Sequence, residues 1–166
     1  MDNRKIRSVH GFTVIEIMIV VTVLAVIAAI VIPSYQAYIS RSSAAQAQQA
    51  VQQIATELEK HRSRNFNYRG YTAPSDLLVV PSGATGSAVK YNLTVVDGTN
   101  GTPALTATTA AGQSWVIRAI SVGSKNYSFL MTSSGIRCKT RTAANITVTT
   151  STSANCGSEA SGSELW

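Results

Sequence analysis

The segment from residue 11 to residue 41 reads GFTVIEIMIVVTVLAVIAAIVIPSYQAYISR. Positions 17–32 are apolar at 15 of 16 places, with Thr22 as the exception. The residues from Phe12 to Ile32 span about 31 Å as a helix, which is enough to cross a hydrocarbon core of about 30 Å. The sequence therefore predicts a membrane-spanning helix near the N-terminus.

Charges on either side of this helix predict its orientation. Arg4, Lys5 and Arg7 precede the apolar run, whereas no basic residue follows it directly. This asymmetry predicts that the N-terminus stays inside and that the rest of the chain is exported. An ordinary secretory signal needs a shorter apolar region and a small-x-small cleavage site. Ala28-Ala29-Ile30 fits such a site poorly, and the apolar run continues beyond it.

Glu16 is the one charged residue inside the apolar segment. A carboxylate there costs roughly 2.5–3.5 kcal/mol on insertion scales, so it is usually kept because it has a partner. A plain signal anchor accounts for the length and the flanking charges but not for Glu16. The alternative is a glutamate near the helix start that reaches the headgroup region.

The motif GFTVIE at residues 11–16, followed by the apolar helix and Pro33-Ser34-Tyr35-Gln36, resembles the class III signal of type IV pilins and pseudopilins. The resemblance implies that a prepilin peptidase removes the leader, residues 1–11, by cutting between Gly11 and Phe12. It also implies N-methylation of Phe12. Residues 12–39 would form the transmembrane and assembly helix.

The same resemblance implies the interaction partners of the chain and its cellular location. Glu16 would neutralise the new amino group of Phe12 on a neighbouring subunit during assembly. The implied partners are other pilin subunits, the prepilin peptidase and the inner-membrane pilus assembly machinery. The chain would be a single-pass inner-membrane protein before assembly and then part of an extracellular pilus on a Gram-negative-type bacterium.

Pro33 lies inside the helical pattern, which predicts a kink in the helix at this position.

An amphipathic helix is predicted over residues 40–64. Its apolar residues recur at helical spacing, and its other face is rich in glutamine. This stripe is expected to pack on the chain's own sheet and to end near residues 62–65. The apolar positions are Ala37, Ala44, Ala47, Val51, Ile54 and Leu58.

Residues 65–166 are expected to form a loop followed by an antiparallel sheet. The Gly- and Pro-containing stretch 65–90 predicts a long loop with a short helix near 75–78. The dipeptides Asp97-Gly98 and Asn100-Gly101 predict turns. Strands are predicted at 91–95, 105–110, 115–121, 127–132 and 136–142. The fold class is therefore α+β, with the long helix on an antiparallel sheet, as in the type IV pilin fold.

Cys138 and Cys156 are the two cysteines of the chain. An exported domain is expected to lie in an oxidising compartment, which favours a disulfide between them. The pair is also similar to the disulfide that bounds the C-terminal loop of many pilins. The alternative is two free thiols in a core.

Enzymatic activity is not expected, and neither a metal nor a cofactor is predicted. The histidines are His10 and His61 only, and one of them lies in the leader. Motifs of the CxxC, HExxH, P-loop and GxSxG types do not occur in the sequence.

Four basic residues gather at the predicted end of the helix and are interleaved with aromatic residues. Basic side chains follow phosphates and aromatic rings stack on bases, so this pattern allows contact with single-stranded nucleic acid. The reading favoured by the sequence is a solvated helix end that contacts other subunits. The basic residues are Lys60, Arg62, Arg64 and Arg69.

Within the pilin family the chain most resembles a minor pilin that takes part in assembly. The resemblance lies in residues 32–41, 57–60 and 134–138. Minor pilins serve fibres that act in twitching motility, adhesion and DNA uptake. The alternatives are a major pilin, a type II secretion pseudopilin and, from another class, a signal-anchored periplasmic binding module that keeps its leader. Many pseudopilins have an acidic calcium-binding loop, but no carboxylate lies between Asp97 and Glu159.

Overall fold

The computed structural model describes residues 11–123 and 126–166, so the predicted leader lies outside the described residues except for Gly11. A helix of 52 residues, α1 (Val14–Asn65), is followed by a sheet-containing region. The chain divides into two compact units, residues 1–39 and residues 40–166. The second unit is called the head below.

The N-terminal part of α1 is long and apolar enough to cross a membrane, with a mean hydropathy of 3.0 over its best 18-residue window. Its apolar side chains are exposed, with Val14 at 79% and Ile30 at 69%. The helix continues through Pro33, and the predicted kink stays a prediction.

The head contains a six-stranded antiparallel sheet in which neighbouring strands follow one another along the chain. The predicted meander is therefore confirmed. The strands are β1 (Val79–Val80), β2 (Tyr91–Asp97), β3 (Trp115–Ser121), β4 (Ser128–Thr132), β5 (Arg137–Thr140) and β6 (Glu164–Leu165). Short 3-10 helices are η1 (Ser75–Leu77), η2 (Gly86–Ala88), η3 (Ala143–Asn145) and η4 (Glu159–Ser161).

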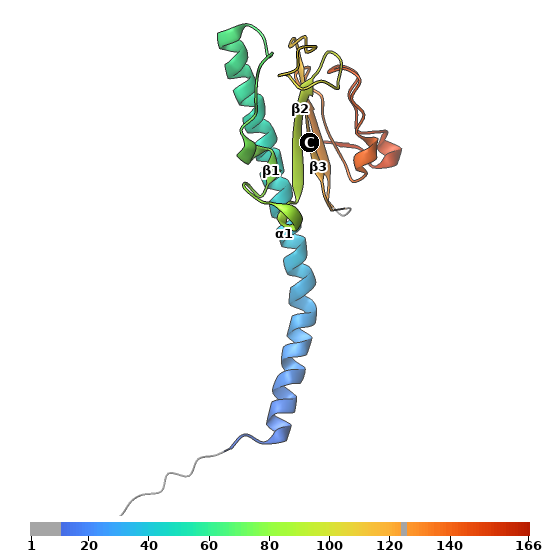
Figure 1. Ribbon diagram of the computed structural model, residues 1–166. Coiled ribbons are helices and arrows are strands. Elements are labelled where there is room, and N and C mark those ends of the chain that lie inside the picture. Colours follow the sequence, from blue (N-terminus) through green and yellow to red (C-terminus); the bar gives the residue numbers. More distant parts are fainter. Residues whose placement is uncertain (1–10, 124–125) are drawn as a thin grey trace, which may run out of the picture. The chain divides into compact units, whose positions relative to one another are not determined.

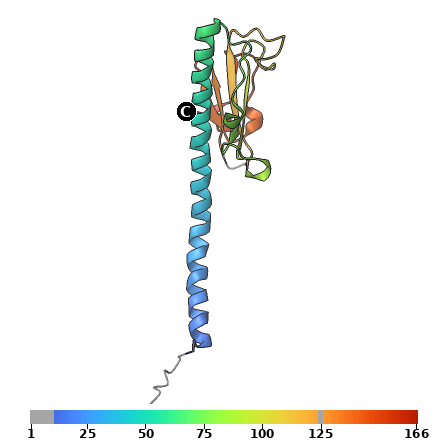
Figure 2. The same ribbon diagram turned by 60° about the vertical axis from the view of Figure 1, so that its left-hand side comes forward.

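The main core lies between the second half of α1 and one face of the sheet (Figure 1). Val51, Ile54 and Leu58 of α1 have no exposed surface. They belong to one cluster with Tyr91 of β2 and Phe129 of β4. The predicted apolar stripe of the helix therefore packs on the chain's own sheet. Figure 2 shows this second half of α1 lying along the sheet.

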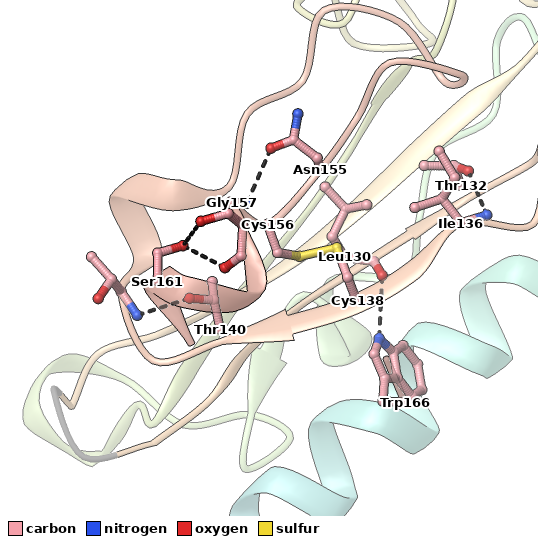
Figure 3. The surroundings of a disulfide bond; sticks show 12 residues. Leu130, Thr132, Ile136, Cys138, Thr140, Asn155, Cys156, Gly157, Ser161 and Trp166 are labelled. Carbon is pink, nitrogen blue, oxygen red and sulfur yellow. Dashed lines mark hydrogen bonds between the residues drawn. A yellow bond between two sulfur atoms is a disulfide. The ribbon is translucent and has the colours of Figure 1, made fainter. Parts of the chain in front are cut away.

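A second core covers the opposite face of the sheet. Val116 and Leu130 from the sheet cluster there with Ile146 of the C-terminal segment. The disulfide between Cys138 and Cys156, with a Cα–Cα distance of 6.0 Å, ties that segment to β5 (Figure 3). The predicted disulfide is confirmed, and it holds a polar segment against the sheet.

The C-terminus is also fixed to the sheet. The indole Nε1 of Trp166 donates to the carbonyl oxygen of Leu130 at 3.2 Å (Figure 3). Its ring meets Phe129 edge-on with centroids 5.5 Å apart. The last two residues before it form β6, which pairs with β5.

Reduction of the disulfide is expected to lower the stability of the head by roughly 3 kcal/mol, since the bond closes a loop of 18 residues. The thermal unfolding midpoint of the full chain with and without reductant measures this effect. The double variant Cys138→Ser/Cys156→Ser should match the reduced protein and show no further response to reductant. An unchanged midpoint would contradict this role.

One predicted strand is wrong, and two strands were not predicted. Residues 105–110 form turns, with the Ala107 amide bound to the Ala104 carbonyl and the Ala110 amide bound to the Ala107 carbonyl. Leu105 is the one large apolar residue of this stretch. The amides of Ala111 and Gly112, directly after the stretch, bind the Asp97 carboxylate, as described below. The two-residue strands β1 and β6 are too short to show an alternating pattern.

Candidate functional site

The predicted processing residues lie just before α1. Gly11 and Phe12 are in non-helical chain, and Phe12 is 78% exposed. The hydroxyl oxygen of Thr13 accepts a hydrogen bond from the Glu16 amide at 3.3 Å, which caps the helix start. Glu16 thus lies in the first turn, where a carboxylate is favoured by the helix dipole.

The four predicted basic residues lie within ten positions, at the other end of α1 and in the loop that follows it, and all are exposed. The Arg62 guanidinium lies 5.4 Å from the centroid of the Tyr68 ring, and its Nη1 donates to the Tyr68 hydroxyl at 3.2 Å. This hydrogen bond raises the pKa of Arg62. Arg69 Nη2 donates to the Thr108 carbonyl at 2.8 Å. Two of the four cations are therefore held in place by the head.

Carboxylates in the same region are bound by hydroxyl and indole donors of the head. Glu59 Oε1 accepts from the Tyr68 hydroxyl at 2.8 Å and from Trp115 Nε1 at 3.3 Å. Glu57 accepts from the Tyr71 hydroxyl at 2.9 Å. Burial, and then the hydrogen bond to Glu59, raises the pKa of Tyr68. The two acidic groups are thus engaged by neutral donors, while the four cations stay exposed.

The loop after α1 is fastened to a second loop, residues 98–114, which joins β2 to β3. The Tyr68 amide donates to the Gly112 carbonyl at 2.9 Å, and the Gly70 amide donates to the Leu105 carbonyl at 2.8 Å. Gly112 has a φ of +68°, and a Cβ there would lie 2.6 Å from the Arg69 amide nitrogen. The two loops therefore meet too closely for a side chain at this position.

Asp97 at the end of β2 organises the second loop. Its carboxylate is fully buried and accepts from the amides of Thr99 at 2.8 Å, Gly112 at 3.0 Å and Ala111. Burial raises the pKa of this group, but the three amide donors outweigh it, so the pKa lies below the ordinary value. The sequence showed Asp97 only as part of a turn dipeptide, and the distance to residues 111 and 112 hid its second role.

These features define a class of protein: a subunit with an apolar N-terminal helix whose second half packs on an antiparallel sheet, which is the architecture of a type IV pilin. The family model of the prokaryotic N-terminal methylation motif matches residues 6–32. The family model described as type IV minor pilin ComP, DNA uptake sequence receptor, matches residues 33–116. The chain belongs to this family of type IV minor pilins. No curated protein and no solved structure gives a match.

The family match covers about half of the chain. It includes the loop after α1, with its basic residues, and the loop 98–114. It ends at the beginning of β3, so the disulfide and the C-terminal segment lie outside it. With the methylation motif and the apolar helix, the match gives a membrane-anchored precursor that becomes part of an extracellular pilus. The chain is therefore a structural subunit of the fibre.

Proposed function

We propose that this minor pilin binds DNA at the pilus surface through the basic cluster at the end of α1. Four cations lie within ten residues, and the two nearby acidic side chains are bound by Tyr68, Tyr71 and Trp115. Exposed cations of this kind neutralise phosphates and release counterions. The family description as a DNA uptake sequence receptor supports DNA uptake over twitching motility or adhesion as the role of this chain. The family description thus favours DNA over the subunit contact that was expected from the sequence.

The processing and assembly steps complete the proposal. Cleavage between Gly11 and Phe12 would release an amino group that is methylated and that pairs with Glu16 of a neighbour. The exposed, non-helical chain at Phe12 supports access of a peptidase to this bond. The signal motif and the methylation-motif match support the same steps.

Removal of two cluster charges tests the DNA-binding proposal. The double variant Lys60→Gln/Arg64→Gln is expected to reduce the slope of log K against log salt by about 2, because each lost phosphate contact removes about 0.9 from that slope. The measurement is the fluorescence anisotropy of a labelled duplex titrated with the full chain in detergent, at 50–200 mM salt.

A matched control removes two exposed charges elsewhere on the head. The variant Arg41→Gln/Lys90→Gln changes the net charge equally, and both residues are exposed and lie away from the end of α1. It should leave the slope nearly unchanged. Equal losses in the two variants would show a general charge effect and would contradict a site at the end of α1.

A further inference from the structure

Phe66, the first residue after α1, has an unusual backbone conformation and is exposed. Its φ is +59°, and no other non-glycine residue in 11–123 or 126–166 has a positive φ. Its side chain is 91% exposed. This position after a helix is usually glycine, because a residue with a Cβ is strained in the left-handed region.

Among the described residues, burial of the Phe66 side chain does not offset the cost of this backbone conformation. A large apolar side chain normally stabilises a fold through burial, and here the ring remains in solvent. The residue therefore adds backbone strain and exposed apolar surface at the same point. Strain that persists at an exposed side chain points to a function outside the fold.

The backbone that carries the ring is fixed on both sides. The Phe66 amide donates to the Arg62 carbonyl at 2.7 Å, which closes the last turn of α1. The next residues are bound to the loop after β2, since Asn67 Nδ2 donates to the Ala111 carbonyl at 3.4 Å and the Tyr68 amide donates to Gly112. Tyr68 is only 1% exposed. The ring is thus presented from a rigid turn.

The surroundings of Phe66 identify the chemistry of its partner. Arg62, Arg64 and Arg69 lie within four residues of it, and all three are exposed. Cations that hold a phosphate backbone next to an exposed aromatic ring match the requirements of nucleic acid, whose bases offer a flat π-face beside the phosphates.

We propose that Phe66 is a base-stacking residue, whose ring stacks on a nucleobase of the DNA that the basic cluster holds. This inference rests on the proposed function. The base face is available in an unpaired strand, and also in a duplex when an apolar side chain is wedged into a base step. The two sources share the same contact, so single-stranded and duplex DNA are separate arms of the test.

The decisive variant is Phe66→Gly, because stability and binding should move in opposite directions. Glycine relieves the left-handed strain, so the unfolding midpoint of the head should rise by about 3 °C. Loss of the ring should weaken DNA binding about tenfold or more, as typical for a lost stacking contact. Phe66→Trp should retain binding. Val122→Ala is the control: Val122 is 61% exposed and directly follows the last residue of β3, and its substitution should leave DNA binding unchanged.

The readouts are the affinity of the full chain in detergent and the emission of 2-aminopurine placed at successive positions of single-stranded and duplex oligonucleotides. Wild type should change the emission at a limited set of positions, and Phe66→Gly should abolish this change. Unaltered affinity and emission in Phe66→Gly, while Lys60→Gln/Arg64→Gln loses binding, would overturn the stacking role and leave the proposed function standing.

Other outcomes would also overturn the inference. Absence of DNA binding by wild type in both arms would remove the proposed function and the stacking role with it. A Phe66→Gly variant with a lowered midpoint would show that the ring serves the fold. Full DNA binding together with a reduced amount of the variant in fibres would show that the ring contacts another subunit.

Discussion

Asp97→Ala is expected to lower the free energy of unfolding of the head by about 3–5 kcal/mol. The carboxylate is fully buried and serves the amides of Thr99, Ala111 and Gly112. Removing it leaves three amides without their acceptor, and each costs about 1–3 kcal/mol when buried and unpaired. Chemical unfolding of the full chain, followed by tryptophan fluorescence, measures the loss.

Asp97→Ala should also weaken DNA binding, although it substitutes none of the basic residues. The loop after α1 is bound to the loop that Asp97 organises, through the amide of Tyr68 and the carbonyl of Gly112. When that support is lost, the cations and Phe66 are no longer held in a fixed arrangement. A variant with reduced stability but unchanged affinity would show that the two loops act independently.

The pH dependence of stability follows from the lowered pKa of Asp97. Because the folded pKa lies below the unfolded value of about 3.9, this contribution is fully present above pH 4 or so. It is lost as the pH falls through the folded pKa. Asp97→Asn, which retains the size but not the charge, should remove this part of the acid limb while the other carboxylates still titrate.

Glu16→Ala is expected to lower the amount of the chain in fibres at least a hundredfold while leaving cleavage intact. In the proposed assembly the carboxylate neutralises the amino group of Phe12 on a neighbouring subunit. Removing one member of a buried ion pair costs about 3–5 kcal/mol, and each 1.4 kcal/mol is a factor of ten. Mass spectrometry of sheared fibres and of the membrane fraction measures both quantities.

Thr13→Ala separates this pairing from the capping of the helix. It removes the acceptor of the Glu16 amide and retains the carboxylate, so its cost should be near 1 kcal/mol and incorporation should fall less than tenfold. Equal defects in Glu16→Ala and Thr13→Ala would assign the effect to the helix start. Normal incorporation of Glu16→Ala would contradict the proposed ion pair between Glu16 and the Phe12 amino group of a neighbouring subunit.

Much of the fold could be predicted because its signals are local or strongly periodic. The apolar run and the spacing of Val51, Ile54 and Leu58 predict a helix that ends near residues 62–65, and α1 ends at Asn65. The alternation over residues 91–95 predicts most of β2, and the content of β-branched and aromatic residues predicts β3. The prediction of a strand at 105–110 was wrong because threonine favours strands, whereas this backbone forms local turns and its Leu105 carbonyl accepts from the distant Gly70 amide.

The candidate site was only partly visible in the sequence. The basic cluster appears directly, since Lys60, Arg62 and Arg64 alternate along the helix end. The partners that hold two of its cations are not visible in the sequence: Arg62 donates to the Tyr68 hydroxyl, and Arg69 donates to the Thr108 carbonyl, 39 positions away. The left-handed conformation of Phe66 has no sequence signal, because glycine is the residue that marks such positions.

The most direct test of the account is the amount of DNA retained by sheared fibres, per copy of this chain counted by mass spectrometry. We expect fibres that carry the wild-type chain to contain a chain beginning at methylated Phe12 and to retain DNA. Fibres with Lys60→Gln/Arg64→Gln should contain as many copies and retain several-fold less DNA. Equal retention by both kinds of fibre, at equal copy number, would contradict the assignment of DNA binding to the end of α1.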